Sequence, residues 1–320
     1  MSGILAREIG LVRLSVDGRP CLAYPRLTGP IALGDDVVVN TQALDLGLGS
    51  GGFDVLAVNL TRGLGLLPER AAHVMKLPYT PLQVAVAHGE EDGLAASELS
   101  SRPVVCCTLH SQLVPVCAGI GRALRSAYVQ LPGGALPVSL SDAVRGLKRA
   151  GLLELTIAVG ACVDGDLACV TVASALTVAA GHGIDVVVCG IGPGIVGTGT
   201  PLGHGGLAAA DAVNAAAALG GRPIVAPRVS TVDVRERHRH LSHHTRSVLE
   251  LTLAPAAVAW PAELAPPEGV AGTEIVETDG WREECAGFPL ERMGLGPDED
   301  PWFFAASFAA GRLARAWAAT

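Results

Sequence analysis

Short apolar runs alternate with longer amphipathic stretches along the last two-thirds of the chain. Six such runs, rich in Val, Ile, Ala and Cys, cover residues 103–109, 126–131, 154–159, 184–190, 222–229 and 256–260. Apolar runs of this length are typical of strands that are buried on both faces of a parallel sheet. Stretches of helical length, such as residues 139–153 and 207–221, separate them. The pattern therefore predicts a mainly parallel, doubly wound α/β domain of Rossmann-like architecture over residues 103–260.

The first part of the chain has a different rhythm. Residues 1–80 contain short alternating or β-branched runs separated by Asp-Gly and Gly-Gly turns. This pattern favours antiparallel strands joined by tight turns, so we expect a small antiparallel domain that resembles a β-barrel. Residues 81–102 are interpreted as a linker. Residues 261–320 are expected to form a C-terminal extension whose aromatic helix packs on the body of the α/β domain.

Composition and charge narrow the classes of function. Hydrophobic residues make up 49% of the chain and aromatic residues 4%, so the core must be mainly aliphatic. The net charge of −8 argues against nonspecific nucleic-acid binding. The eight cysteines include no CxxC pair and are expected to be reduced and buried. Residues 167–184 are nearly uncharged, yet their Ala, Thr and Gly content favours a buried helix over a membrane span.

These observations also bear on location and assembly. The N-terminus carries charges before any signal-peptide core could form, so we expect a cytoplasmic protein. Neither nucleic acid nor a membrane is expected as a partner. The apolar fraction of the chain is high, and neither of these partners is expected to cover apolar surface. We therefore expect a homo-oligomer.

A long glycine-rich loop follows the fourth predicted strand. Gly192, Gly194 and Gly197 satisfy the GxGxxG pattern, and two threonines extend it. Backbone N–H groups in such a loop can converge on a phosphate or carboxylate, which is the favoured interpretation. A nicotinamide cofactor and a purely structural loop are the alternatives. The predicted ligand-binding residues of the loop are Gly192, Gly194, Gly197, Thr198, Gly199 and Thr200.

The stretch "RERHRHLSHHTR" at residues 235–246 concentrates cationic and titratable side chains. In a parallel sheet it would emerge at the same edge as the glycine loop, the carboxyl ends of the strands. Ser242 is a candidate helix N-cap, which would leave His240 outside the helix. Three interpretations remain: an anion site assisted by protonatable histidines, which the arginines favour, a metal site, and a solvated or interface-forming surface.

Further candidates lie on the same edge. Asp233 could orient a histidine or hold a metal, and His110 ends the first strand of the predicted domain. The candidate catalytic residues are His238, His240, His243, His244 and Asp233, and the further candidate ligand-binding residues are Arg228, Arg235, Arg237 and His110. No metal ligand is assigned, and the motifs identify no cofactor.

Several blocks of the sequence are familiar. They are "NTQALDLGLGSGG", "MKLPYTPLQ", "LHSQL", "GGALP", "GPGIVGTGTPLG", "RVSTVDVRERHRHLSHHT" and "DPWFF", and they span nearly the whole chain. In these blocks the chain resembles an uncharacterised bacterial family, domain of unknown function 3866. The resemblance implies no activity, so the chemistry must be argued from the residues.

Two classes of function follow from these residues. In the first, the protein is an enzyme that binds a small phosphorylated, nucleotide-like or carboxylated metabolite, with histidine acid/base chemistry. In the second, it is a noncatalytic sensor or assembly protein that binds such a ligand. A metal-dependent hydrolase is a further alternative, because histidines are also common metal ligands.

Overall fold

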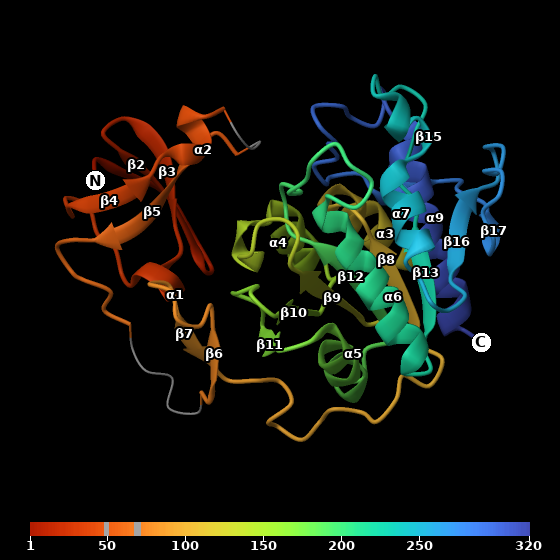
Figure 1. Cartoon of the computed structure of the whole chain (residues 1–320), viewed down its shortest axis with the longest axis horizontal. Helices are drawn as coiled ribbons and strands as arrows, with labels where there is room; N and C mark the ends of the chain where they lie inside the picture. The colour runs from red at the N-terminus through yellow and green to blue at the C-terminus, as the bar shows by residue number, and fades with distance from the viewer. Residues whose placement is uncertain (48–50, 67–71) are drawn as a thin grey trace. The chain divides into compact units, whose positions relative to one another are not determined.

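The structure is a computed structural model that describes residues 1–47, 51–66 and 72–320 (Figure 1). Within these ranges the chain divides into two compact units, Met1–His88 and Gly89–Thr320. The boundary falls inside the segment interpreted as a linker from the sequence.

The first unit is built from short strands and two single-turn helices. They are β1 (Gly3–Glu8), β2 (Leu11–Val16), β3 (Arg19–Ala23), α1 (Pro25–Thr28), β4 (Val37–Asn40), α2 (Gln42–Asp45), β5 (Asp54–Asn59), β6 (Val74–Lys76) and β7 (Val84–Val86). Five strands form a sheet of order β1-β2-β3-β5-β4, and β6 pairs with β7. Residues including Leu14, Cys21 and Leu56 form its core.

The five-stranded sheet is mainly antiparallel, as predicted, but one of its strand pairs is parallel. Strands β3 and β5 run parallel, whereas the other three neighbouring pairs are antiparallel. A parallel pair needs a long crossover rather than a tight turn, and α1, β4 and α2 lie between these two strands in the sequence. Closure into a barrel stays a prediction, because the order of the sheet ends at β1 and β4.

The second unit contains an eight-stranded parallel sheet. Its strands are β8 (Pro103–Cys107), β9 (Ser126–Leu131), β10 (Leu155–Val159), β11 (Leu167–Cys169), β12 (Val186–Ile191), β13 (Arg222–Ala226), β16 (Ala257–Pro261) and β17 (Thr273–Val276). The order is β11-β10-β9-β12-β8-β13-β16-β17, and each neighbouring pair is parallel. The mainly parallel α/β architecture is confirmed. The sequence pattern missed the edge strands β11 and β17, which are only three and four residues long.

Helices cover both faces of this sheet. They are α3 (Leu113–Ile120), α4 (Asp142–Arg149), α5 (Val172–Gly181), α6 (Ala208–Ala218), α7 (His243–Glu250), α8 (Trp281–Glu284) and α9 (Pro301–Ala318), with single turns η1 (His110–Gln112), η2 (Val138–Leu140), η3 (Gly205–Leu207) and η4 (Glu236–His238). Side chains alternate between two cores: Val104 and Cys106 contact one, whereas Val105 and Cys107 contact the other. Helices α5, α6 and α7 belong to the first core, and α3, α4 and α9 to the second.

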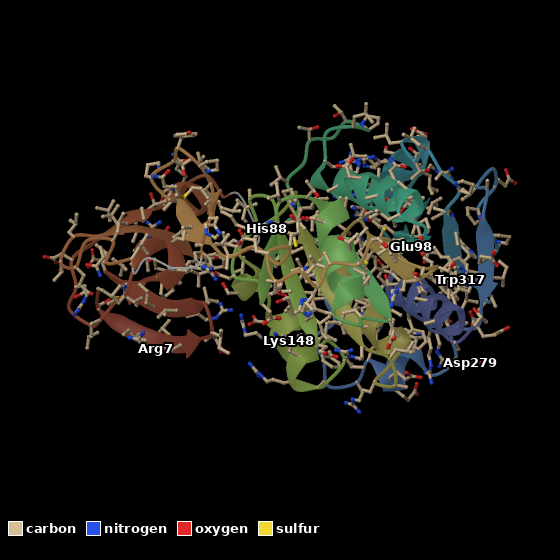
Figure 2. All side chains as sticks on the ribbon, turned by 90° about the horizontal axis from the view of Figure 1, so that it is seen from below. Arg7, His88, Glu98, Lys148, Asp279 and Trp317 are labelled. Atoms are coloured by element: carbon tan, nitrogen blue, oxygen red, sulfur yellow. The ribbon has the colours of Figure 1, made fainter. Side chains whose placement is uncertain are left out.

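The C-terminal helix α9 packs tightly on α3. A Cβ atom on Gly311 would lie 2.0 Å from the carbonyl oxygen of Val116, and one on Gly119 would lie 2.4 Å from that of Phe308, so both glycines permit close approach of the two backbones. Trp317, labelled in Figure 2, lies near the end of α9 and packs under the Arg222 guanidinium, 3.9 Å from the ring centroid.

Two further expectations from composition can be compared with the structure. The eight cysteines are free and buried, as expected. The uncharged stretch 167–184 contains β11 and the half-buried helix α5 rather than one long helix. Within residues 1–47, 51–66 and 72–320, no helix has the length and apolarity needed to cross a membrane.

Candidate functional site

The loops after β8, β9 and β12 contact one another at the carboxyl edge of the parallel sheet. A Cβ atom on Gly205 would lie 1.9 Å from the carbonyl oxygen of Gly133, and one on Gly134 would lie 2.3 Å from that of Gly192. A Cβ on Gly206 would lie 2.8 Å from the carbonyl oxygen of the β8 loop residue Thr108. These three loops therefore lie together at this edge. Several of their glycines are therefore required by backbone packing.

The glycine-rich loop folds back on itself and ends at a histidine. The Thr198 amide donates to the Gly203 carbonyl at 2.6 Å, and Gly197 and His204 form a β-bridge. Gly192 is buried, whereas the predicted ligand-binding residues Gly194, Gly197, Thr198, Gly199 and Thr200 are exposed. Helix α6 begins only at Ala208, so its N-terminus does not directly follow the GxGxxG segment. These contacts support a structural role for the loop, in which it positions His204, more strongly than a role in phosphate binding.

Four imidazole rings lie together where this loop meets the start of α7. His204 stacks on His244 with ring centroids 3.9 Å apart, and His243 lies 4.5 Å from His244. His238, in η4, lies 4.7 Å from His243 and 4.9 Å from His244. Ser242 accepts a hydrogen bond from the amide of His244 and is the N-cap of α7, as predicted. The cap places His243 and His244 in the first turn of the helix.

His204 is the least satisfied of these rings. Its side chain is 6% exposed, and among the described residues neither ring nitrogen has a hydrogen-bond partner. The Pro201 carbonyl lies near enough to oppose the lowering of the His204 pKa, but it is outside hydrogen-bonding geometry. His243 Nε2 is likewise buried and unpartnered within the described part of the chain. A neutral imidazole carries one proton and one lone pair, so both rings hold unused hydrogen-bonding capacity.

The other two rings have defined partners. Arg228 Nη1 lies 3.1 Å from His244 Nδ1. Arginine has no acceptor, so Nδ1 accepts and the proton of neutral His244 is on Nε2. His238 Nδ1 lies 2.7 Å from the hydroxyl of Ser242.

An arginine network lies beside the rings. Asp233 accepts hydrogen bonds from Arg235 and Arg292 at 2.9–3.1 Å, whereas Arg228 Nη2 is 3.5 Å from the same carboxylate. Arg292 Nε also forms a 2.9 Å ion pair with buried Asp300, although its N–H is not aligned for a hydrogen bond. Three guanidinium groups therefore face two carboxyl groups, which leaves an excess of positive charge.

The excess of positive charge affects the buried guanidinium group of Arg228. Arg228 is 2% exposed, and its Nε has no partner among the described residues. Burial, together with the charges of Arg292 and Arg235, lowers the pKa of Arg228 to about 9. By contrast, although burial opposes the change, hydrogen bonds from Arg235 hold the pKa of Asp233 below its ordinary value. Asp233 therefore acts as an anionic partner for arginines, with no hydrogen bond to the histidine rings among the contacts of the described residues.

The environment keeps the four histidines neutral at pH 7. Burial lowers the pKa of His204 to about 4, of His238 to about 3 and of His244 to about 2, and it also lowers that of His243. The charge of Arg228 adds to the effect at all four rings. The expectation of readily protonatable histidines is therefore wrong, because desolvation and nearby arginines both disfavour the cation.

Among the described residues, the remaining candidates form no hydrogen bond with the four rings. His110 Nε2 is 2.7 Å from the Ser141 hydroxyl, and its Nδ1 is 3.2 Å from the Ile191 carbonyl oxygen. His240 is exposed in β15 (His240–Leu241), which pairs with β14 (Val229–Ser230). Arg237 is exposed, and its charge contributes to the lowered pKa of His243.

Sequence reasoning missed three residues of the site. His204 could have been found, because it ends the glycine loop at the predicted edge of the sheet. Arg292 and Asp300 come from the C-terminal extension. The "DPWFF" block begins at Asp300, but no local pattern indicates that Arg292 pairs with both Asp300 and Asp233.

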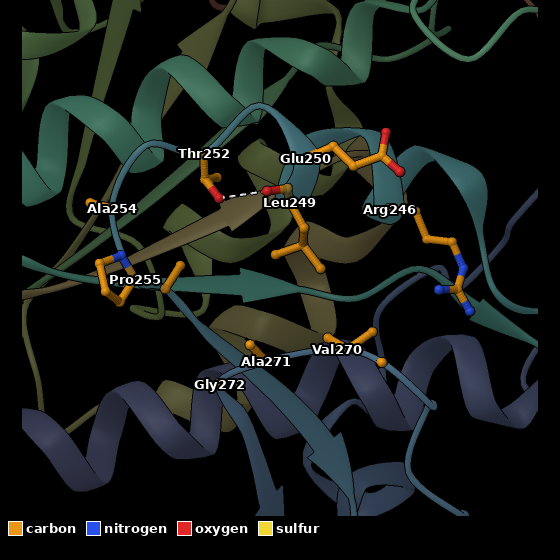
Figure 3. A pocket seen from close by; sticks show the side chains of 11 residues that line it. Arg246, Leu249, Glu250, Thr252, Ala254, Pro255, Val270, Ala271 and Gly272 are labelled. Atoms are coloured by element: carbon orange, nitrogen blue, oxygen red, sulfur yellow. Dashed lines mark hydrogen bonds between the residues drawn. The ribbon is translucent and has the colours of Figure 1, made fainter.

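A separate cavity of about 360 Å³ lies along the later part of α7, between that helix and the segment before β17 (Figure 3). Arg246 and Glu250 are among its lining residues, and Thr252 donates to the Leu249 carbonyl at 2.7 Å. The last arginine of the "RERHRHLSHHTR" stretch therefore lines this cavity, whereas His243 and His244 belong to the first turn of the helix.

The family model described as "Protein of unknown function (DUF3866)" matches residues 20–311, so the chain belongs to this family. Neither the curated proteins nor the solved structures contain a match.

Proposed function

We propose that this member of the DUF3866 family binds a small anionic metabolite, phosphorylated, nucleotide-like or carboxylated, at the carboxyl edge of its parallel sheet. The observation that carries the proposal is the incompletely compensated charge of buried Arg228. Its nearest carboxylate oxygen, on Asp233, is 3.5 Å away, and its Nε lacks a partner among the described residues. An anion that approaches this network would relieve the excess of positive charge, and guanidinium groups bind phosphate and carboxylate well.

The solvent side of the network offers groups that a ligand can reach. Arg237 is exposed and Arg235 is half-buried, so their guanidinium groups can meet an incoming anion. The Thr198 and Thr200 hydroxyls are exposed and lie 2.9 Å apart. We assign the ligand first to the arginines and secondly to the glycine-rich loop.

The geometry supports binding more strongly than proton transfer. A general base is most effective when its pKa lies near the working pH, and burial places the pKa values of His204, His238 and His244 at about 4, 3 and 2. A noncatalytic sensor or assembly protein therefore remains the alternative to an enzyme. Turnover of a bound ligand would distinguish the two.

A thermal-shift screen tests the proposal. Inorganic phosphate, sulfate, citrate, nucleotides and sugar phosphates are added separately to the full chain. At a concentration 100 times its Kd, a true ligand stabilises the folded protein by about 2.7 kcal/mol and raises the Tm. We expect Arg237→Gln to reduce that shift.

Arg246→Gln is the matched control, because Arg246 belongs to the same stretch but lines the separate cavity. It should leave the shift unchanged. The proposal fails if no anion raises the Tm, or if only Arg246→Gln reduces the shift.

A further inference from the structure

We propose that His204, His243 and His244 together bind one divalent transition-metal ion, with Zn²⁺ as the representative case. Each side chain offers one ligand nitrogen, and these three nitrogens lie within 4.8 Å of one another. The ligands come from two segments that are distant in the sequence: the end of the glycine loop and the first turn of α7. Three imidazoles suit Zn²⁺, Co²⁺, Ni²⁺ or Cu²⁺ better than Mg²⁺ or Ca²⁺, which prefer oxygen ligands.

The burial of His204 is an independent observation that points to a ligand. Buried polar groups are normally hydrogen-bonded, because an unpaired one costs about 1–3 kcal/mol. His204 is 6% exposed and, within the described residues, has no partner at either ring nitrogen, while its ring stacks on His244. A metal ion bound to its lone pair would supply the missing interaction.

The required movement is small. Zn–N bonds of about 2.1 Å at tetrahedral angles place ligand nitrogens about 3.4 Å apart. Nitrogens now within 4.8 Å must therefore approach by up to about 1.4 Å. His243 is half-buried, and its Nε2 has no partner in the described part of the chain, so this ring can rotate without losing a hydrogen bond from that atom.

His244 imposes a condition on binding. Its Nδ1 accepts from Arg228 at 3.1 Å. If Nδ1 binds the ion, it needs the lone pair that Arg228 now occupies. If Nε2 binds the ion, its proton must move to Nδ1, which then can no longer accept. In both cases Arg228 must release His244.

The released Arg228 then needs a new acceptor. Three protein nitrogens leave one position open on a tetrahedral ion, and an anion in that position would neutralise positive charge and accept from Arg228. This coupling rests on the proposed function, whereas the metal site itself does not. The metal and inorganic phosphate should therefore each increase the affinity for the other.

Metal titration of the chelator-treated full chain tests the site. Calorimetry with Zn²⁺ should show one ion per chain, and Co²⁺ should develop the visible absorption of a tetrahedral nitrogen site. His204→Ala and His243→Ala should each weaken Zn²⁺ binding by more than about 100-fold, because loss of an outer-shell partner alone costs about 10–100-fold.

His240→Ala is the matched control, since His240 lies in the same stretch but is exposed and apart from the three ligands. It should bind Zn²⁺ as the unaltered chain does. Circular dichroism should show that the variants are folded. If His204→Ala does not fold, the milder substitution His243→Gln tests the site in its place.

The proposal is overturned if the folded chain binds no Zn²⁺ or Co²⁺, or if both ligand variants keep their affinity. Binding of Zn²⁺ without any phosphate effect would support the metal site and count against the anion proposal. Binding of phosphate without Zn²⁺ would support the anion proposal and refute the metal site.

Discussion

His110 and His204 follow strands of the same sheet at the same edge, and burial lowers the pKa of each to about 4. Their surroundings differ completely. The Ile191 carbonyl can only accept, so His110 Nδ1 donates to it and Nε2 accepts from the Ser141 hydroxyl. His204 has neither kind of partner among the described residues and stacks on another imidazole instead.

This comparison separates a structural histidine from a candidate ligand. Ser141 is 1% exposed and accepts from the Val144 amide as the N-cap of α4, so the Ser141–His110 pair is a closed network inside the protein. By contrast, the cluster around His204 contains ring nitrogens that have no hydrogen-bond partner among the described residues. Depressed pKa values alone would have grouped the two histidines, and only the hydrogen-bond partners distinguish them.

The largest effect is expected when the carboxylate beside the His204 cluster is removed. Asp233→Ala would leave Arg228 and Arg292 buried without their shared partner, and loss of one member of a buried ion pair costs about 3–5 kcal/mol. Urea unfolding followed by tryptophan fluorescence should show the loss, because all four tryptophans lie in the second unit.

The control for Asp233 is Asp298→Ala. The Asp298 side chain is 90% exposed in its pair with Arg282, and its loss should cost less than about 0.5 kcal/mol. Equal effects of the two substitutions would contradict the importance of the buried network.

The next prediction compares the two histidines directly in metal-free protein. His110→Ala breaks two partly buried hydrogen bonds and should destabilise the second unit by about 3 kcal/mol. His204→Ala breaks none that the structure describes and should cost only about 1 kcal/mol of packing. Urea unfolding of both variants measures the difference. A larger cost for His204→Ala would reverse the distinction drawn between them.

The smallest effect is the pH dependence that His110 contributes. The unfolded chain binds a proton at this residue below about pH 6.5, whereas the folded chain does so only near its lowered pKa of about 4. Stability should therefore fall as the pH drops from 6.5 towards 4. The loss should be about 1 kcal/mol between pH 6.5 and about pH 5.5. His110→Gln should show a shallower decline than the unaltered chain. Parallel curves for the two proteins would show that His110 does not titrate in this way.

Much of the parallel domain could be predicted from the sequence alone. Runs of Val, Ile and Ala identified six of the eight strands, because strands buried on both faces must be apolar throughout. Ser242 was recognisable as a cap because its hydroxyl can accept from an amide in the first helical turn. These features depend on local chemistry. The parallel pairing of β3 with β5 does not, and it was missed.

The membership of the site was decided by the tertiary structure. Strand β8 lies between β12 and β13 in the sheet, so the loops after β12 and β13 are brought together by a strand order that no local pattern encodes. That order places His204 on His244 while it leaves His240, only four residues from His244, exposed to solvent. Arg292 reaches Asp233 from the C-terminal extension in the same way. Residue types and spacing determine which chemistry the chain carries, but packing between distant segments determines which groups meet and which lose their contact with water.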